Sequence, residues 1–388
     1  MTEPQQLAGN QLTLLQNGAE YFPLLCADID AAQRTVLLET YIFAADNTGR
    51  MVRIALQRAA GRGVKVRVLL DGFGSAELPQ SWVDEMVAAG IVVQWFRRAI
   101  SPFTWQRSRV RRLRRLHRKL VAVDGEIAYI GGINIIDDIP HGGNIAAPRL
   151  DYAVRVQGDI AHQVHEEMRY LWATVKWATL RKRLNRMRVL LRHRHENAEG
   201  VPLQLLLRDN LRHRSDIERA YLQAIAEAHS EIIIANAYFL PGWAFRQALK
   251  AAAARGVRVV LLLQGRVEHR LQHYAMLALF GQLLRDGIEL YQYQHSFLHA
   301  KVGVVDGAWA TVGSSNLDPF SLLLAREANL VVRDAKFAGM LRDSLLQAIQ
   351  SGGLRIGHTS LNPLSQLLAR LSYGVIRLLI SLLVRQRH

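Results

Sequence analysis

The stretch HAKVGVVDGAWATVGSSN, residues 299–316, has a near-copy earlier in the chain, HRKLVAVDGEIAYIGGIN, residues 117–134. Both copies place His, Lys, Asp, two small residues and Asn at identical offsets. At ordinary composition a single HxKx4D pattern is a rare chance event in a chain of this length, so two copies with matching flanks are not accidental. The repetition predicts either a duplicated scaffold or one site built from two halves.

The sequence around the two copies is also duplicated, block by block and in the same order. VLLETYIF (36–43) corresponds to IIIANAYFL (232–240), and RGVKVRVLLDG (62–72) corresponds to RGVRVVLLLQG (255–265). These apolar, β-branched blocks are typical of strands, and the Ala-, Leu- and Arg-rich stretches between them are typical of helices. We therefore predict an α/β fold with two fused halves, each a mixed β-sheet flanked by helices.

Two basic insertions and an amphipathic end interrupt this symmetry. RSRVRRLRRLHRK (107–119) precedes the first motif without a counterpart before the second, and KWATLRKRLNRMRVLLRHRHE (176–196) lies between the halves. The predicted boundaries are a first half at 1–175, a basic linker at 176–200, a second half at 201–355 and an amphipathic C-terminal segment at 356–388.

The composition indicates a globular protein with a polyanionic partner. Of its 388 residues 50% are hydrophobic, too many for a disordered chain, and the formal net charge is +16. Cys26 is the single cysteine, which excludes an intramolecular disulfide and fits a reducing compartment. The polar N-terminus lacks the apolar region of a signal peptide, and no apolar run reaches the ~20 residues that span a bilayer. We expect a soluble or peripheral membrane protein that binds nucleic acid or an anionic membrane surface.

Each motif predicts a β-hairpin whose first strand carries the His and the Lys on one face. An ammonium group is no metal ligand and repels cations, so these lysines disfavour a metal site and suit an anion. Two Lys and two Asn side chains converging on one point would bind a phosphate and stabilise its transition-state charge. Two histidines could then divide the work, one attacking phosphorus and the other protonating the leaving oxygen. The pattern predicts phosphoryl transfer through a phosphohistidine, without a metal or another cofactor.

The candidate site residues follow from the two motifs. The catalytic candidates are His117, Lys119, Asp124, His299, Lys301 and Asp306, and the phosphate-binding candidates are Asn134, Asn316 and Ser314. Asp124 and Asp306 lie at the expected hairpin turns, where anchoring the turn or the motif Lys is favoured over direct catalysis. Ser314 has Gly132 as its counterpart, so only the second copy offers a hydroxyl at this position.

A nucleophilic histidine has to be neutral and held in one tautomer, usually by an acceptor on its other nitrogen. Asp151 in LDYAV and Glu327 in REANL lie at matching places downstream of the two motifs. These two carboxylates are therefore the candidates that orient the histidines.

The paired HxKx4D motifs, each followed by GG or GS and Asn, resemble those of the phospholipase D superfamily. ETYIF, RGVKVRVLLDG, NAYFLPG and VGSSNLDPFSLLLAREANL are similar to the bacterial cardiolipin synthases within it. The resemblance covers nearly the whole chain. It implies two halves related by a pseudo-twofold axis, with the active site between them.

The resemblance also implies a reaction. A phosphatidyl group would be joined to the head-group hydroxyl of a second lipid, with phosphatidylglycerol as the usual substrate and cardiolipin and glycerol as the products. His117 would be the nucleophile and His299 the general acid and then base, with Asp151 and Glu327 orienting them. A phospholipase D-type phosphodiesterase that hydrolyses phospholipid or nucleic acid is the alternative, and a lipid-binding protein with a dead site is disfavoured because both motifs are intact.

The choice between lipid and nucleic acid depends on three segments. The Arg-rich arm at 107–118 could follow a nucleic-acid backbone or bind anionic head groups. AISPFTWQ (99–106) suits an interfacial loop or an ordinary folded loop. The helix that we expect from Pro363 could lie in a membrane interface or dock on the protein's own core.

The chain shows no recognition helix, aromatic stacking motif or zinc finger, and we therefore favour the membrane. The expected partners are phosphatidylglycerol, other phospholipids and an anionic membrane surface, with no nucleic acid. We expect a peripheral protein on the cytoplasmic side of the inner cell membrane. The sequence leaves the acceptor alcohol open, and two motifs in one chain remove any need for a dimer to complete the site.

Overall fold

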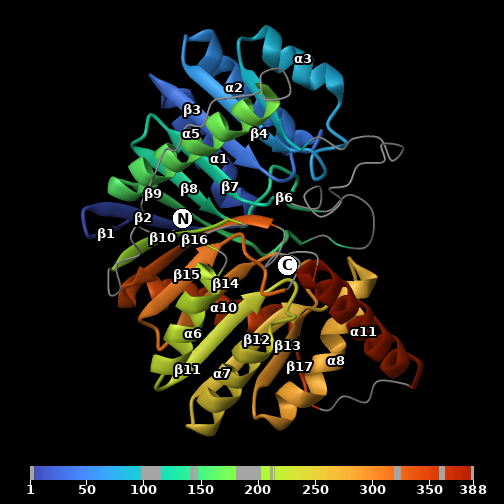
Figure 1. Cartoon of the computed structure of the whole chain (residues 1–388). Coiled ribbons are helices and arrows are strands. Elements are labelled where there is room, and N and C mark those ends of the chain that lie inside the picture. The colour runs from blue at the N-terminus through green and yellow to red at the C-terminus, as the bar shows by residue number, and fades with distance from the viewer. Residues whose placement is uncertain are drawn as a thin grey trace.

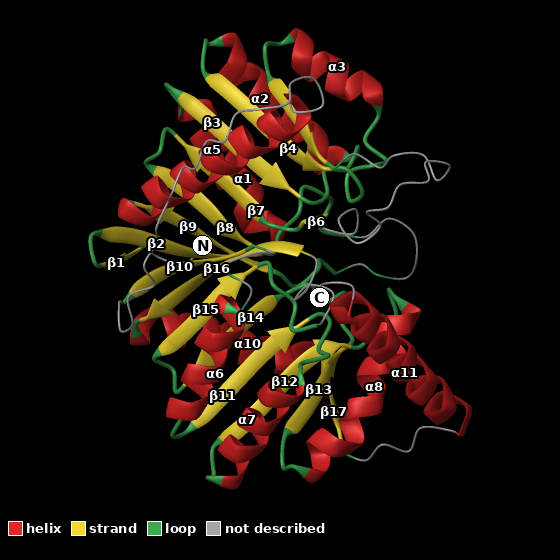
Figure 2. Cartoon of the chain, in the orientation of Figure 1, coloured by secondary structure: helices red, strands yellow, loops and turns green. Residues whose placement is uncertain are grey.

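The computed structural model describes residues 4–97, 115–139, 145, 147–180, 202–209, 213, 215–318, 325–357 and 363–385 (Figure 1). Most of the Arg-rich arm, the loop at 99–106 and residues 181–200 of the expected linker lie outside the described residues. Two β-sheets form the centre of the molecule, one in each half of the sequence, and helices cover them (Figure 2).

The first sheet is mixed, with a parallel part at β3, β4 and β5 and antiparallel pairs elsewhere. Its strands, in spatial order, are β1 (Gln5–Leu7), β2 (Asn10–Gln16), β9 (Tyr152–Gln157), β8 (Ile127–Gly131), β7 (Lys119–Val123), β3 (Thr35–Thr40), β4 (Lys65–Asp71) and β5 (Val92–Phe96).

The second sheet repeats this arrangement. Its strands, in spatial order, are β10 (Leu203–Arg208), β16 (Ala325–Arg333), β15 (Trp309–Gly313), β14 (Lys301–Val305), β11 (Glu231–Asn236), β12 (Arg258–Gln264), β13 (Glu289–Tyr293) and β17 (Gly353–Ile356). A short strand, β6 (Arg115–Leu116), comes from the first half and pairs with β16.

The strand order confirms the predicted duplication. Seven strands of one sheet, from β2 to β5, match seven of the other, from β10 to β13, in order and direction. Both RGV blocks also end a helix in the same way. Gly63 and Gly256 follow α2 and α7 with φ of 87° and 89°, a helix-ending conformation that favours glycine. The α/β fold with two fused halves is therefore confirmed.

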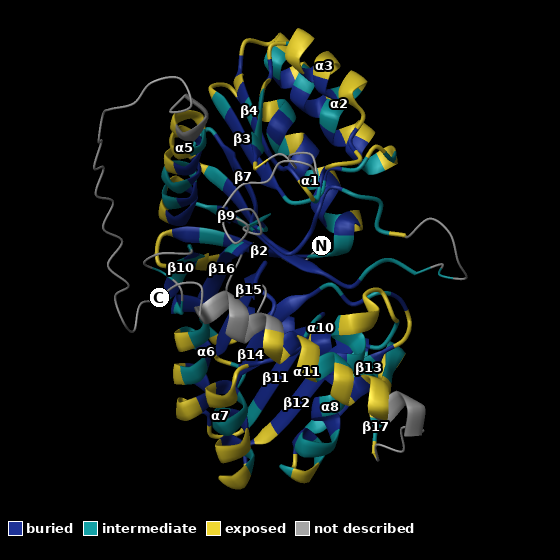
Figure 3. Cartoon of the chain, turned by 45° about the vertical axis from the view of Figure 1, so that its right-hand side comes forward, coloured by how far each residue is buried: buried dark blue, intermediate teal, exposed yellow. Residues whose placement is uncertain are grey.

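Helices pack on the sheets over three large clusters of buried apolar side chains. The described helices are α1 (Asn17–Ala31), α2 (Asn47–Gly61), α3 (Gln80–Ala88), α5 (Asp159–Leu180), α6 (Asp216–Glu227), α7 (Trp243–Ala254), α8 (Arg270–Arg285), α10 (Ala335–Gly352) and α11 (Pro363–Arg385). One core lies under α1 to α3, and a second lies under α6 to α8. The third joins both sheets through α5 and α10, so the two halves share one continuous interior (Figure 3).

This shared interior bears on the predicted boundaries. α5 extends to Leu180, so residues 176–180, which the sequence places in the linker, continue the last helix of the first half. The remaining boundaries stay a prediction.

α11 begins at the predicted Pro363 and packs along α8, as Figure 1 shows. Ala369 and Ile376 are buried on that side. Leu371, Val375 and Leu378 on the other side are 57%, 46% and 60% exposed. The helix therefore docks on the protein and still presents an apolar face outward. Among the described residues, no helix is both long and apolar enough to cross a bilayer.

Candidate active site

Both motifs form the predicted hairpins, and both hairpins end at one pocket between the halves. Each His precedes the first strand, each Lys is the first residue of that strand, and each Asn follows the second strand. The pocket has a volume of 260 Å³. Its lining residues are Tyr41, Ile42, Arg115, His117, Asn134, Arg149, Tyr238, Glu268, His269, Gln272, His299, Asn316, Asp318 and Ala325.

Each histidine is held by the opposite half of the chain. The backbone N–H of His117 donates to the carbonyl of Arg326, and that of His299 donates to the carbonyl of Leu150, at 3.0 and 2.9 Å. The residues that follow these two carbonyls are the predicted carboxylates. His117 therefore meets Glu327, and His299 meets Asp151.

The imidazole contacts place a carboxylate on Nδ1 of each ring. Nδ1 of His117 lies 3.0 Å from both carboxylate oxygens of Glu327, and Nδ1 of His299 lies 2.6 Å from Oδ2 of Asp151. A proton on Nδ1 donates to the carboxylate and leaves the Nε2 lone pair available. Burial lowers the pKa of His117 and lowers that of His299 further, so both rings are held in the neutral form. A neutral imidazole with a free Nε2 is the nucleophilic form.

The two carboxylates differ in proton affinity. Burial raises the pKa of Asp151 to about 6, although Lys301, the Tyr152 N–H and Lys119 oppose this effect. Burial also acts on Glu327, but the contact with His117, the charge of Lys119 and the hydrogen bond of a hydroxyl outweigh it and lower the pKa. The carboxylate beside His117 therefore stays ionised, whereas the one beside His299 exchanges a proton closer to neutral pH.

The hydroxyl that lowers the pKa of Glu327 belongs to Ser314. Its Oγ donates to Glu327 Oε2 at 2.6 Å and accepts from the Ala328 N–H at 3.0 Å, and the residue is fully buried. The hydroxyl is thus committed to Glu327 and does not line the pocket. Its counterpart has to be glycine, because a Cβ on Gly132 would overlap the carboxylate of Asp151.

The motif lysines lie beneath the histidines. The ammonium group of Lys119 donates to the carbonyl of His117 at 2.7 Å, and Lys301 makes the same bond to His299. Both side chains are buried. Burial and the nearby Lys301 lower the pKa of Lys119 to about 7, and burial also lowers that of Lys301. Two desolvated ammonium groups below one pocket favour an anionic ligand.

The motif asparagines line the pocket from both sides. Oδ1 of Asn134 accepts from the Ile42 N–H at 3.2 Å, which leaves the amide nitrogen as the donor toward a ligand. Oδ1 of Asn316 is buried and has no hydrogen-bond partner among the residues that the structure describes. A polar group of this kind is normally satisfied, so a bound molecule is its natural partner.

The motif aspartates lie at the other end of the hairpins. The carboxylate of Asp124 accepts from the N–H groups of Gln33, Arg34 and Thr35, at 2.8, 2.8 and 2.7 Å. Asp306 accepts from the three equivalent groups at the start of β11, the N–H groups of His229, Ser230 and Glu231. Both residues have positive φ in the hairpin turn. These bonds tie each turn to the start of a central strand, and the Ser230 hydroxyl also donates to Asp306. The motif lysines donate to the His117 and His299 carbonyls instead.

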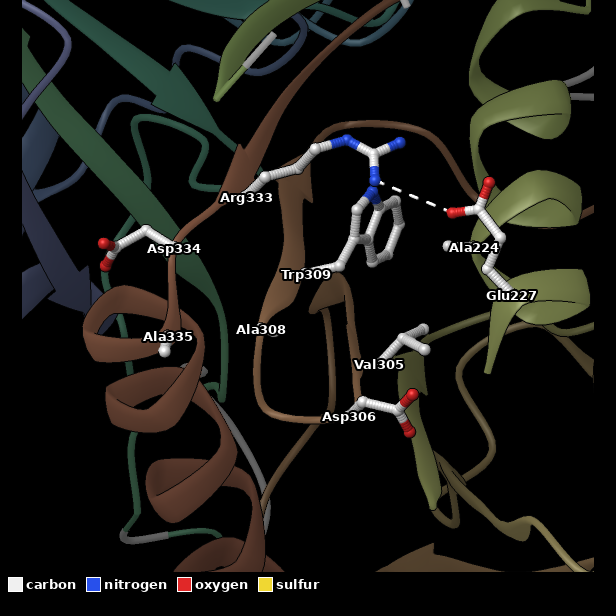
Figure 4. A pocket seen from close by; sticks show the side chains of 9 residues that line it. All are labelled: Ala224, Glu227, Val305, Asp306, Ala308, Trp309, Arg333, Asp334 and Ala335. Atoms are coloured by element: carbon white, nitrogen blue, oxygen red, sulfur yellow. Dashed lines mark ion pairs between the residues drawn. The ribbon is translucent and has the colours of Figure 1, made fainter. Parts of the chain in front are cut away.

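A second pocket, of 350 Å³, lies at this far end of β14 and β15 (Figure 4). Asp306, Trp309 and Arg333 are among its lining residues, and a guanidinium nitrogen of Arg333 lies 3.8 Å from Glu227. Its described lining contains none of the motif His, Lys or Asn side chains. The pocket between the halves is therefore the candidate active site. Among the described residues, no group of three or more His, Cys, Asp or Glu side chains is placed to hold a metal ion.

Sequence reasoning did not identify several residues that line the active-site pocket. Tyr238 and Glu268 follow β11 and β12, and their side chains meet at 2.7 Å from oxygen to oxygen. Arg149 precedes β9, and Arg115 is in β6. The carboxyl ends of parallel strands are the usual position of ligand sites, and this rule would have pointed to the loops after β11 and β12.

Comparison with known proteins extends these observations. The family model described as "Cardiolipin synthase, PLD-like domain" matches residues 25–172 and 221–348. Cardiolipin synthase B of Shigella flexneri is 40% identical over 357 residues, which cover 91% of this chain and 84% of that protein. Cardiolipin synthase A of Pseudomonas putida is 32% identical over 349 residues, which cover 88% of this chain and 68% of that protein.

Solved structures share the fold at low sequence identity. Phosphatidylserine synthase of Haemophilus influenzae Rd KW20 superposes with a TM-score of 0.68 at 14% identity, covering 96% of this chain and 94% of the other. Polyphosphate kinase of Porphyromonas gingivalis gives a TM-score of 0.59 at 15% identity, covering 94% of this chain and 53% of the other. At these identities the likeness is one of fold alone.

Proposed function

The chain belongs to the phospholipase D-like family of cardiolipin synthases, and on that premise we propose that it transfers a phosphatidyl group from one phosphatidylglycerol to the head-group hydroxyl of another. The products are cardiolipin and glycerol. One observation carries this proposal: two neutral histidines, each held through Nδ1 by a carboxylate of the other half, open on a single pocket above two buried lysines.

In the first step His117 Nε2 attacks phosphorus, and the bond from phosphorus to the head-group oxygen breaks. His299 gives that oxygen the proton of its Nε2, which the ring carries when the Asp151 carboxyl holds the proton shared with Nδ1, and glycerol leaves. Lys119, Lys301 and the two Asn amides balance the charge on the phosphoryl oxygens. The phosphatidyl group is then covalently attached to His117.

In the second step a hydroxyl of another phosphatidylglycerol takes the place of the glycerol. His299 removes its proton as the oxygen attacks phosphorus, and the bond from phosphorus to nitrogen breaks. Cardiolipin forms, and His117 is free again. The same groups would transfer the phosphatidyl group to water if water reached the intermediate, so the choice of acceptor depends on water exclusion.

The difference between the two carboxylates supports this division of roles. Glu327, with its lowered pKa, keeps a negative charge beside the phosphohistidine, which gains positive character. Asp151, with a pKa of about 6, shares a proton with His299 near neutral pH, as a general acid and base requires. We therefore assign the nucleophile to His117 and the proton transfers to His299. Ser314 is assigned to positioning Glu327 rather than to phosphate contact.

The experiment that tests the proposal uses purified protein and phosphatidylglycerol vesicles. The expected products are cardiolipin and glycerol in equal amounts, formed without added metal and in the presence of a chelator. Release of phosphatidic acid alone would make the protein a hydrolase. Cleavage of an oligonucleotide would support the alternative phosphodiesterase.

We further propose that the protein acts as a peripheral protein on an anionic membrane, at the cytoplasmic side of the inner membrane. The supporting feature is the outward face of α11, where Arg370 and Arg377 are exposed beside the exposed leucines. Such a face suits an interface of anionic head groups and acyl chains. α11 packs on α8, and α8 contributes Gln272 to the active-site pocket, so a membrane at this face lies near the site.

A further inference from the structure

The two walls of the active-site pocket differ although their backbones are duplicated. The N–H of Ala44 donates to the carbonyl of Ile135, and the N–H of Leu240 donates to that of Leu317 in the same way. This equivalence pairs Ile42 with Tyr238, and both residues line the pocket. The first half thus presents an aliphatic side chain where the second half presents a phenol.

The phenol of Tyr238 belongs to a polar group in the second half. Its hydroxyl donates to Glu268 Oε2 at 2.7 Å, and its ring lies 5.6 Å from that of His269. Gln272 lies one turn further along, in α8, and also lines the pocket. Two separate loops, after β11 and after β12, are therefore joined at the pocket wall by one hydrogen bond.

The corresponding loop of the first half, after β4, contributes no carboxylate to the described lining of the pocket. Asp71 ends β4, is fully buried, and accepts from the N–H groups of Phe73, Gly74 and Leu116. Its carboxylate is used to shape the loop. The charged groups that the first half and its loops present to the pocket are instead the cations Arg115 and Arg149.

The position of His299 determines against which wall of the active-site pocket the leaving and accepting alcohols lie. In the proposed reaction His299 protonates the leaving alcohol and later deprotonates the acceptor, so both alcohols occupy the same place beside it. His299 belongs to the second half, and the Glu268 carboxylate is close enough to act on its proton affinity. The alcohol therefore lies against the wall formed by Tyr238, Glu268 and Gln272.

The chemistry of this wall matches a polyol. Glu268 accepts hydrogen bonds, the phenol oxygen of Tyr238 accepts once its proton is donated to Glu268, and the Gln272 amide both donates and accepts. A hydroxyl group also donates and accepts, whereas an ammonium group only donates. Glycerol and the head group of phosphatidylglycerol retain at least one further hydroxyl beside the oxygen that reacts.

We propose that Tyr238, Glu268 and Gln272 form a subsite that binds the non-reacting hydroxyls of a glycerol-type alcohol, and that this subsite selects both the leaving group and the acceptor. The proposal rests on the phosphatidyl transfer proposed above and adds the residues that determine acceptor specificity. Loss of a hydrogen bond to the Glu268 carboxylate selectively weakens the binding of an alcohol whose hydroxyl makes that bond.

The test is a competition between soluble acceptors. The full chain is incubated with phosphatidylglycerol vesicles, deuterated glycerol and an equal concentration of 1-propanol. Mass spectrometry then gives the ratio of deuterated phosphatidylglycerol to phosphatidylpropanol. The wild type should favour glycerol, and Glu268→Gln and Tyr238→Phe should each lower the ratio by about tenfold. Glu77→Gln, the same change on an exposed residue in the equivalent loop of the first half, should leave it unchanged.

The outcomes separate the subsite from the reaction itself. An unchanged ratio in both variants, with turnover retained, overturns the subsite and leaves the transfer reaction standing. A wild type that makes no transfer product with any alcohol overturns the reaction, and the subsite with it. If ethanolamine outcompetes glycerol in the wild type and Glu268→Gln removes that preference, the site binds an ammonium group and the polyol assignment is wrong. Should Glu268→Gln fail to fold, Tyr238→Phe alone decides, because it removes one hydroxyl.

Discussion

Nδ1 of His117 lies 3.0 Å from the carboxylate of Glu327, which is 210 residues further along the chain and in the other half of the fold. The reciprocal contact joins His299 to Asp151 at 2.6 Å. Each half therefore supplies a histidine that only the other half can orient. Neither half contains a complete catalytic pair, which explains why the motif occurs twice in one chain.

The environment of Glu327 gives a prediction for Ser314. Ser314→Ala removes the 2.6 Å hydrogen bond to Glu327, and a hydrogen bond to a charged group typically contributes about 1.5–3 kcal/mol. We expect kcat to fall by about tenfold with little change in KM, because the residue positions Glu327 and does not hold substrate. Steady-state kinetics on phosphatidylglycerol vesicles measure both constants. A rise in KM alone would indicate that Ser314 contacts the phosphate.

The motif aspartates should contribute to stability rather than to chemistry. Asp306→Asn weakens three backbone hydrogen bonds at the start of β11, and we expect the free energy of unfolding to fall by roughly 1–2 kcal/mol. Backbone hydrogen bonds lower the pKa of Asp306 although burial raises it, so its contribution is present above the ordinary pKa of an aspartate. It is lost as the pH falls through the lowered value.

Urea unfolding at pH 7 and at low pH measures this contribution, with kcat determined in parallel. Asp124→Asn is the matched variant in the first half. A loss of kcat comparable to that of a motif histidine variant, with unchanged stability, would place these aspartates in the chemistry instead.

Binding of a phosphate-like anion should draw a proton into the site. The pKa of Lys119 is about 7 in the free protein, so at pH 8 this side chain is mostly neutral. An anion favours the charged form and raises the pKa, which requires proton uptake. The suitable probe is tungstate, a phosphate-shaped dianion that does not titrate near pH 7.

Isothermal titration calorimetry in two buffers of different ionisation enthalpy measures the uptake. We expect up to about one proton per site for the wild type and less for Lys119→Met. Heats that do not depend on the buffer would show that both lysines are already charged in the free protein.

The outward face of α11 should determine binding to anionic vesicles. Leu371 is 57% exposed, and burying a leucine in an apolar phase contributes about 1.5–3 kcal/mol. Leu371→Glu should therefore reduce cosedimentation with phosphatidylglycerol vesicles by tenfold or more, and leave the thermal unfolding temperature unchanged. Val87→Glu is the control, because Val87 is 54% exposed on α3, in the other half. Equal binding by Leu371→Glu and the wild type would contradict a membrane role for α11.

Much of the fold can be predicted from the sequence because the same pattern of strands and motifs occurs in both halves of the chain. The order of the duplicated blocks predicts the strands, and the Asp-Gly pairs at 124–125 and 306–307 predict hairpin turns, which the positive φ values confirm. The two motifs also predict the His, Lys and Asn side chains that the structure brings to one pocket or directly beneath it.

What the sequence does not determine depends on how the halves pack. Each histidine contacts a carboxylate of the other half only because β6 pairs with β16 and Leu150 lies beside Leu298. No local sequence pattern encodes these contacts. The Tyr238–Glu268 pair joins two loops that are close only after β11 and β12 align. The commitment of Ser314 to Glu327 likewise appears only once β15 and β16 are paired.

The central claim is that His117 carries the phosphatidyl group, and trapping the covalent intermediate tests it most directly. His299→Asn removes the general base that would discharge the intermediate. After reaction with phosphatidylglycerol and a rapid alkaline quench, peptide mass spectrometry should find the phosphatidyl adduct on His117 in this variant and no adduct in His117→Asn. An adduct on His299 in the His117→Asn variant, with none on His117 in the other, would contradict the assignment.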